Sequence, residues 1–469
     1  MSHTVRRIVR SMNARDPHAG AAGLAVGLRG ADGAMMREMN RFLILNCVRE
    51  QGPIARVSIA QRTGLSRTTV SSIIETLIKE GFVREGSLLD ASPTGGRRAI
   101  LVHFNADAGY VLGVDAGRTH FTVIATNLAA EVIARHSGPF DATRGPDICL
   151  PELVRELREF TRREGISWDR IIGVGMGIPG PMDARLRKLI SPPRMPGWDG
   201  VDIRQILRRE LNVPIYLDND ANMGALGESR FGAGRKVSEL AYIKVGTGIG
   251  CGLVINGVVY RGSRGSAGEL GHVTIDADGP LCECGNRGCL ETLAGAPVIG
   301  CDAANGTSLN RQRDREGLPP IKPAAHADMR APMDAADVVR AALEGDAASQ
   351  AAIERAGELI GVALAGLINL FNPSLVLLDG GVARAGDLLI QPVIQAMKSR
   401  SLSAASASTR VAGGALGDSA IALGGVATVL DAAFGRPSLL GEDHGDSQPE
   451  LPAVRVEDAR TPTPAHLRP

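Results

Sequence analysis

The sequence predicts an α/β protein made of a small basic N-terminal domain and a much larger α/β domain. Residues 1–104 contain 15 Lys and Arg against 8 Asp and Glu, whereas residues 105–469 carry a net charge of −6. From residue 110 onward, short apolar runs end in glycine-rich turns and alternate with longer segments of helical spacing, which is the pattern of an α/β fold. We therefore expect a nucleic-acid partner for the basic front end only.

The overall composition is that of an ordinary globular protein. The chain has 469 residues, of which 44% are hydrophobic and 22% are charged, enough for two or three domains. The early arginines are not followed by an adequate apolar segment, so no secretory signal is expected. The uncharged run at 359–378 is interrupted by Asn372 and Pro373, which favours a buried helix followed by a strand over a membrane span. We expect a cytoplasmic protein with reduced thiols and no membrane partner.

Residues 37–104 have the pattern of a winged helix-turn-helix, after a leader at residues 1–36 that we expect to be disordered. A short helix and a glycine turn precede Ser66, which is a good N-cap residue. Apolar residues then follow at i, i+3, i+4 and i+7, as on the buried face of an amphipathic helix. The opposite, polar face would reach base edges in the major groove. Its candidate DNA-binding residues are Ser66, Arg67, Thr68, Thr69 and Ser71.

A hairpin with a basic tip is expected after this helix. The glycine-rich turn at 93–96 is followed by Arg97 and Arg98, which we interpret as a wing that grips phosphate or the minor groove. The alternative is a three-helix module whose polar face is merely solvated. Because the turn, the polar face, the wing and the positive charge coincide, we favour DNA binding.

The second domain is expected at residues 109–433 and opens with three strands. The turn after the first strand contains Asp115, Gly117 and Thr119, and strands joined in this way are typical of the bilobal actin-like, sugar-kinase ATPase fold, which is ribonuclease-H-like. A second glycine turn, around Thr247 and Gly248, lies between two later strands. Turns of this kind let backbone amides approach phosphate closely.

Polar residues also mark the end of a later strand. Asp218, Asn219 and Asp220 end a strand just before a helix, and a carboxylate there could face a cleft and accept a proton from a hydroxyl. The alternative is that Asp218 or Asn219 only caps the helix. The glycine-dense strand at 171–180 indicates close approach of the backbone to a ligand or to another chain.

One short stretch has the composition of a structural zinc site. His272, Cys282, Cys284 and Cys289 supply one imidazole and three thiolates, a closed tetrahedral ligand set. The alternatives are unpaired core thiols or a disulfide, and a Cys-x-Cys loop is a poor disulfide in a chain with no sign of an oxidising compartment. Two carboxylates, Glu269 and Glu291, bracket the set.

These residues resemble the signature of the ROK family of repressors and sugar kinases. Glu-x-Gly-His is followed by Cys-x-Cys-Gly-x-x-Gly-Cys-x-Glu, over residues 269–291. The resemblance implies that the His and the three Cys bind zinc and that Asp220 would be the general base of a kinase. It also implies a set of sugar-binding residues, namely Asn219, Asp220, Glu269, His272 and Glu291.

The resemblance raises a doubt about ATP. Kinases of the family have Asp-x-Gly-Gly-Thr in the first turn, and this chain has Arg118 in place of the second glycine. Arg118 could crowd the phosphates or donate hydrogen bonds to them. We favour crowding, which would weaken ATP binding. ATP and Mg²⁺ are therefore expected as cofactors only if kinase activity survives. The corresponding ATP-binding residues would be Asp115, Gly117, Thr119, Thr247, Gly248, Gly380 and Gly381.

The resemblance covers residues 40 to 433. Three segments lie outside the resemblance: the leader, a predicted surface insertion at 300–332, and a tail at 434–469 that we expect to be disordered. Trp198 could stack on a sugar face or anchor the packing of a lobe.

Two functions are compatible with these motifs. The first is a sugar-responsive repressor that binds operator DNA as a homodimer or homotetramer and takes a sugar or sugar phosphate as effector. The second is an ATP-dependent sugar kinase of the glucokinase type, or a protein that combines both activities. The kinase leaves residues 37–104 without a role, so the regulator is favoured.

Overall fold

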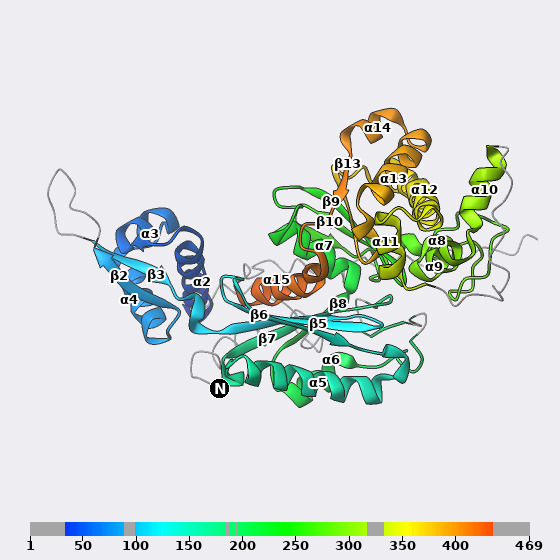
Figure 1. The fold of residues 1–469 in the computed structure, drawn as a ribbon. Coiled ribbons are helices and arrows are strands. Elements are labelled where there is room, and N and C mark those ends of the chain that lie inside the picture. The colour runs from blue at the N-terminus through cyan, green and yellow to red at the C-terminus, as the bar shows by residue number, and fades with distance from the viewer. Residues whose placement is uncertain are drawn as a thin grey trace, which may run out of the picture. The chain divides into compact units, whose positions relative to one another are not determined.

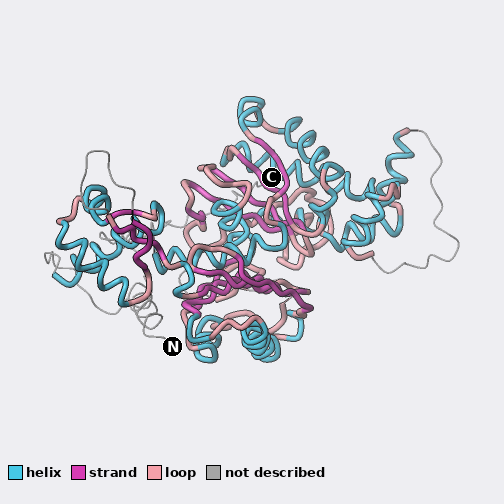
Figure 2. The backbone as a smooth tube through the Cα atoms, turned by 60° about the vertical axis from the view of Figure 1, so that its left-hand side comes forward, coloured by secondary structure: helices cyan, strands magenta, loops and turns pink. Residues whose placement is uncertain are grey.

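The computed structural model describes residues 33–88, 99–183, 188–190, 192, 195–316 and 333–434. The predicted leader up to residue 32, the predicted wing residues Arg97 and Arg98, and residues 435–469 lie outside the described part. Within it, a small N-terminal domain precedes two α/β lobes (Figure 1). Figure 2 shows the strands of the larger domain gathered in two sheets with helices against them.

The N-terminal domain is a helix-turn-helix with a three-stranded sheet. The second helix of the motif is capped by Ser66, whose Oγ accepts from Thr69 N at 3.1 Å. Its apolar face is buried as the spacing predicts, and Gly64 forms the turn before it with φ of 72°. The elements are α2 (Gly33–Gln51), β1 (Ile54–Ala55), α3 (Arg56–Thr63), α4 (Arg67–Lys79), β2 (Val83–Leu88) and β3 (Ile100–Phe104), with sheet order β1-β3-β2.

The first lobe contains a five-stranded sheet with the order β6-β5-β4-β7-β8. Its first three strands form an antiparallel meander, and β7 and β8 add to β4 in parallel. Trp198 is buried beside the helices of this lobe and its Nε1 donates to Ala142 O at 2.8 Å. The packing role of Trp198 is therefore the correct alternative. The elements are β4 (Tyr110–Ala116), β5 (His120–Asn127), β6 (Val132–Pro139), α5 (Pro146–Arg163), β7 (Ile171–Ile178), α6 (Ile203–Leu211) and β8 (Ile215–Asn219).

The second lobe repeats this strand order as β11-β10-β9-β12-β13. Again three antiparallel strands are followed by two parallel ones. The elements of the lobe are α7 (Asp220–Phe231), β9 (Glu239–Val245), β10 (Ile249–Ile255), β11 (Val258–Tyr260), α8 (Leu290–Ala294), α9 (Ala296–Asn305), α10 (Thr307–Arg315), α11 (Ala335–Leu343), α12 (Ala347–Phe371), β12 (Leu375–Asp379), α13 (Asp387–Arg400), α14 (Ser403–Ser408) and β13 (Arg410–Gly413).

Strand β9 shows why this sheet is covered on both faces. Successive side chains of a strand point to opposite faces. Leu240 and Tyr242 belong to the hydrophobic cluster that contains α7 residues, whereas Ala241 and Ile243 belong to the cluster that contains α12 and α13 residues. A run that is apolar at nearly every position is therefore buried from two sides.

Helix α15 (Ala420–Phe434) lies between the two sheets together with α7 (Figure 1). It approaches the first sheet so closely that glycines are required at the contact. A Cβ added to Gly113 would lie 1.9 Å from Ala422 O, and one added to Gly175 would lie 2.0 Å from Gly425 O. These glycines serve helix–strand packing and not a ligand.

We expect Gly175→Ala to destabilise the protein by about 3 kcal/mol or more, because the new methyl group meets backbone that cannot move aside. Gly366→Ala is the matched control: Gly366 is exposed on α12 with nothing within 4 Å of an added Cβ, and the substitution should stabilise by about 0.5–1 kcal/mol. Denaturant unfolding measures both. Equal effects of the two substitutions would contradict the close-packing explanation.

The C-terminal end of α15 contacts the N-terminal domain. Asn46 Nδ2 donates to Phe434 O at 3.0 Å, and the rings of Phe104 and Phe434 meet edge to face at 6.1 Å. Val426, Val429 and other apolar residues of α15 share a hydrophobic cluster with the helix-turn-helix core. The N-terminal domain is thus packed against the helix that also supports the first sheet.

Two sequence predictions about the C-terminal half can be compared with the structure. The run at 359–378 is the end of buried helix α12, a left-handed cap at Asn372 and strand β12, as predicted. The boundary predicted at residue 300 falls inside α9, because Gly300 and Ala303 are buried and residues 307–315 continue as α10. One described helix, Gly417–Phe434, is long and apolar enough to cross a membrane, but 67% of it is buried inside the protein.

Candidate functional site: a cleft beside a Cys₃His cluster

The predicted zinc ligands come together in the structure. One ligand atom from each of His272, Cys282, Cys284 and Cys289 lies within 4.8 Å of the others. Cys282 Sγ is 3.7 Å from His272 Nδ1, and Cys284 Sγ is 3.7 Å from Cys289 Sγ. Ligands that each lie about 2.3 Å from a tetrahedral zinc are separated by such distances, whereas a disulfide requires about 2.05 Å. The donor set therefore fits zinc, and the disulfide alternative is wrong for these cysteines.

Local backbone conformation brings the four ligands together. His272 ends a single helical turn, and Cys289 begins α8 as its N-cap residue. Gly288 has φ of 59°, and a Cβ there would lie 1.6 Å from Asp276 O. Burial, followed by the neighbouring thiols, raises the pKa of Cys289 to about 12. Metal binding would therefore release protons from the cluster and weaken on acidification.

The two acids beside the cluster face a cavity of about 390 Å³ that both lobes line. Glu291 Oε2 accepts from Ile249 N at 2.9 Å, which fixes the carboxylate at the second glycine turn. Burial raises the pKa of Glu269. All five predicted sugar-binding residues line this cavity, namely Asn219, Asp220, Glu269, His272 and Glu291.

Asn219 and Asp220 lie where β8 passes into α7. Asn219 caps α7, accepting from Ala221 N at 2.9 Å, and its Nδ2 donates to Gly180 O at 3.0 Å. The capping alternative for Asn219 is thus confirmed, although the residue also lines the cavity. Asp220 Oδ1 accepts from Ala221 N at 2.8 Å, which orients its second oxygen into the cavity.

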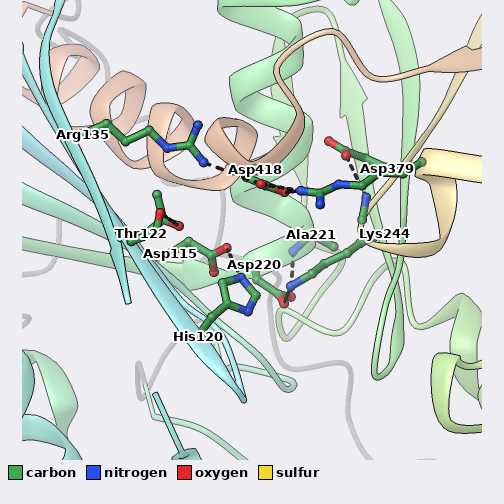
Figure 3. A network of polar contacts seen from close by, with 12 residues as sticks. Asp115, His120, Thr122, Arg135, Asp220, Ala221, Lys244, Asp379 and Asp418 are labelled. Carbon is green, nitrogen blue, oxygen red and sulfur yellow. Dashed lines mark hydrogen bonds and ion pairs between the residues drawn. The ribbon is translucent and has the colours of Figure 1, made fainter. Parts of the chain in front are cut away.

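Sequence reasoning missed the partner of Asp220. Lys244 Nζ lies 2.6 Å from Asp220 Oδ2 (Figure 3), and Lys244 reaches the cavity from strand β9. Its side chain is 18% exposed. The sequence does contain an indication of such a partner. Lys244 stands in the otherwise apolar run 240–245, and a lysine there requires a buried anion or access to solvent.

Six of the seven predicted ATP-binding residues line the same cavity. Asp115, Thr119, Thr247, Gly248, Gly380 and Gly381 all contribute to it, whereas Gly117 is absent from the lining among the described residues. Asp115 is 3% exposed, with His120 Nε2 at 3.6 Å from its Oδ2.

Arg118 spans the two glycine turns. Its Nε donates to Thr247 Oγ1 at 3.0 Å, so that a residue of the first turn binds the hydroxyl of the second. A Cβ placed on Gly248 would lie 2.5 Å from Glu291 Oε2 and 3.4 Å from Arg118 Nη2. The guanidinium therefore lies in the space between the turns, beside the Glu291 carboxylate.

Further polar contacts surround Asp379 and Asp418, which also line the cavity (Figure 3). Asp418, just before α15, pairs with Arg384 of the second lobe and lies 3.7 Å from Arg135 Nη2 of the first. Tyr242 OH donates to Asp379 Oδ2 at 3.0 Å. Asp379 also faces Gly414, as does the buried Glu228: a Cβ there would lie 3.0 Å from Asp379 Oδ2 and 2.9 Å from Glu228 Oε1.

We expect the free energy of unfolding to fall as pH rises above about 4, because burial raises the pKa of both Asp379 and Glu228. The unfolded carboxyls ionise first, near their ordinary pKa of about 4, and the folded ones only at higher pH. Stability is therefore lost between the two values and is constant above the folded pKa. Asp379→Asn should flatten this slope.

Denaturant unfolding between pH 4 and pH 7.5 tests this expectation. Asp387→Asn, at an exposed position at the start of α13, is the control. A slope that Asp379→Asn and Asp387→Asn change equally would contradict the assignment to the buried pair.

The polar face of α4 is open to solvent. Ser66, Arg67 and Thr68 are exposed, and Thr69 and Ser71 are half-buried. The Ser66 hydroxyl is 2.8 Å from the hydroxyls of both threonines. A helix N-terminus with short hydroxyl side chains and one arginine has the chemistry that contacts phosphates and base edges.

Comparison with known proteins agrees with this division of the chain. Residues 111–432 match the ROK family model, and residues 40–84 match a winged helix-turn-helix DNA-binding model. A xylose repressor of Caldicellulosiruptor bescii is 31% identical over 400 residues, which cover 84% of this chain and 96% of the relative. A glucokinase of Halalkalibacterium halodurans is 32% identical over 327 residues, which cover 68% of this chain and 94% of the relative.

A solved structure covers both domains. It is described as a ROK family transcriptional regulator, a homologue of the Escherichia coli MLC protein. It aligns with a TM-score of 0.68 and 25% sequence identity, over 86% of this chain and 97% of its own.

Proposed function

This chain belongs to the ROK family, and from that premise we propose that it is a sugar-responsive, DNA-binding transcriptional repressor. Its winged helix-turn-helix would bind an operator. The cavity between the lobes would bind the effector, with zinc holding one wall in place. The observation that carries the proposal is the helix-turn-helix itself: the repressor relative matches 400 residues of the chain, and the kinase relative matches 327.

The mechanism we infer is a change in lobe arrangement on effector binding. The groups that line the cavity come from both lobes, so a sugar that contacts both favours one relative arrangement over others. Such a ligand shifts the equilibrium only to the extent that it binds the two arrangements with different affinity. Helix α15 contacts both the first sheet and the N-terminal domain, and it therefore offers a direct connection between them.

We expect the active form to be a homodimer or homotetramer in the cytoplasm. A pseudo-palindromic operator mirrors the two-fold symmetry of its protein, and each half-site takes one recognition helix. Size-exclusion chromatography with light scattering measures this state directly.

The proposal is tested by DNA selected from a random library with the full-length protein. We expect Arg67→Ala to lower affinity for the selected sequence by about 10- to 100-fold and to relax specificity. Arg97→Ala should weaken binding to all sequences alike. Arg163→Ala, an exposed arginine at the end of α5, is the control and should change nothing, with salt held constant throughout.

Addition of effector sugar should release the selected DNA. If no sequence is enriched, or if neither Arg67→Ala nor Arg97→Ala changes affinity, the assignment as a DNA-binding regulator fails.

A kinase remains the second candidate because Asp220 and both glycine turns line one cavity. A coupled ATPase assay over a sugar panel, with Asp220→Ala as control, measures this activity. Turnover that Asp220→Ala abolishes would establish a regulator that is also a kinase.

A further inference from the structure

Lys244 of strand β9 and Asp220, the first residue of helix α7, form an ion pair in the wall of the cavity. Lys244 Nζ is 2.6 Å from Asp220 Oδ2, and the two side chains are only 18% and 10% exposed. Burial alone would lower the pKa of Lys244, but the carboxylates of Asp220 and Asp115 raise it. The lysine is thus a cation that an internal carboxylate already neutralises.

Carboxylates outnumber cations on the walls of this cavity. Among the described residues its lining contains seven Asp and Glu side chains but only two Lys and Arg side chains, Lys244 and Arg118. A group that carries further negative charge would enter a site with an excess of negative charge, and in a partly desolvated cavity like charges repel strongly.

The positive groups that could hold a phosphate are engaged by the protein itself. Lys244 binds Asp220. Arg118 donates to Thr247 and lies beside Glu291. The Ile249 N–H of the second glycine turn, a typical phosphate donor, binds the Glu291 carboxylate at 2.9 Å. A phosphate could use Lys244 or the Ile249 N–H only by displacing an internal carboxylate, and could use Arg118 Nε only by displacing the Thr247 hydroxyl.

We propose that the effector is an uncharged sugar and not a sugar phosphate, and that Lys244 and Asp220 bind it together. Lys244 donates to a sugar hydroxyl and Asp220 accepts from one. A neutral polyol offers both donors and acceptors and adds no charge, whereas a phosphate monoester adds about −2 at neutral pH. This inference rests on the proposed sensor function of the cavity and specifies the class of ligand.

Isothermal titration calorimetry of the full-length protein tests the proposal with matched pairs. The probes are D-glucose with glucose 6-phosphate, N-acetylglucosamine with its 6-phosphate, and D-xylose with xylose 5-phosphate. We expect at least one free sugar to bind at least about tenfold more tightly than its ester. An ester that binds as tightly or more tightly overturns this inference and leaves the sensor function standing. Absence of binding by all six overturns both.

Substitution of Lys244 adds a second measurement. Lys244→Met should lower the affinity for the free sugar and the affinity for its ester by the same factor, about tenfold. The reason is that the lost contact is to a hydroxyl that both ligands share. Lys244→Arg should restore part of the affinity. Lys398→Met, on α13, is the control. If Lys244→Met loses affinity for the ester but not for the free sugar, Lys244 binds the phosphate and the proposal is overturned. If the methionine variant does not fold, the same result in Lys244→Arg overturns the proposal.

Discussion

Removal of the metal should unfold the wall of the cavity and abolish sugar binding while DNA binding persists. We expect about one zinc per chain and a fall of about 10 °C or more in the melting temperature on chelation. Structural zinc contributes about 10–16 kcal/mol of binding free energy in small zinc domains, which is folding free energy where the site exists only in the folded chain. Glu269, His272 and Glu291 lie within or just beside the segment 272–289 that holds the Cys₃His cluster, and all three line the cavity.

Differential scanning fluorimetry with and without chelator measures the stability, and elemental analysis counts the metal. Cys289→Ser should reproduce the effect of chelation because Cys289 is fully buried in the cluster. Cys301→Ser is the matched control, since Cys301 is an exposed cysteine of α9 outside the cluster. A chain that keeps its melting temperature and sugar affinity without metal would refute the structural role of zinc.

Arg118→Gly should strengthen the binding of ATP. The guanidinium of Arg118 lies between the two glycine turns and donates to Thr247, where the phosphates would have to approach both backbones. Glycine would restore the Asp-x-Gly-Gly-Thr turn of the kinases. We expect the Kd for Mg-ATP to fall by about tenfold or more, which corresponds to about 1.4 kcal/mol.

The loss of the Arg118 charge by itself is expected to lower ATP affinity, so an increase in affinity could not be explained by charge. Loss of a cation alone should weaken the binding of an anion. Arg135→Ala, which removes a cation from another part of the cleft margin, is therefore the charge-matched control and should not increase ATP affinity. If Arg118→Gly weakens ATP binding, Arg118 is a phosphate donor and the crowding explanation is wrong.

Restored ATP binding need not restore catalysis. Asp220 would still be paired with Lys244 at 2.6 Å, and a carboxylate held by a cation is a weaker base than a free one. We therefore expect phosphoryl transfer in Arg118→Gly to stay far below that of a sugar kinase.

Several features could be predicted from the sequence because their determinants are close together in the chain. The four residues of the Cys₃His cluster span 18 residues, and glycines within that span allow the turns that bring them together. Helix α4 follows from one N-cap residue and an apolar face at helical spacing. The helix and strand around Asn372 follow from an Asn-Pro pair at the end of an apolar run.

Other features could not be predicted because more than one outcome satisfied the local chemistry. Trp198 could contact a sugar or the core, and only the packing of the first lobe placed its indole against Ala142. Residues 300–305 are mostly small and show no clear helical spacing of large apolar residues, yet Gly300 and Ala303 are buried because the second lobe covers α9.

The family, helix α4 and the Cys₃His cluster could be inferred from the sequence alone, since each depends on residue types at short, fixed spacings. The groups that the cavity presents to a ligand, by contrast, depend on contacts that exist only in the folded chain. Arg118 and Thr247 are 129 residues apart and belong to different lobes, and their contact exists only because two sheets of the same topology face each other. The pairing of Asp220 with Lys244 also depends on the tertiary structure, because the start of helix α7 and strand β9 bring these opposite charges together only in the folded chain.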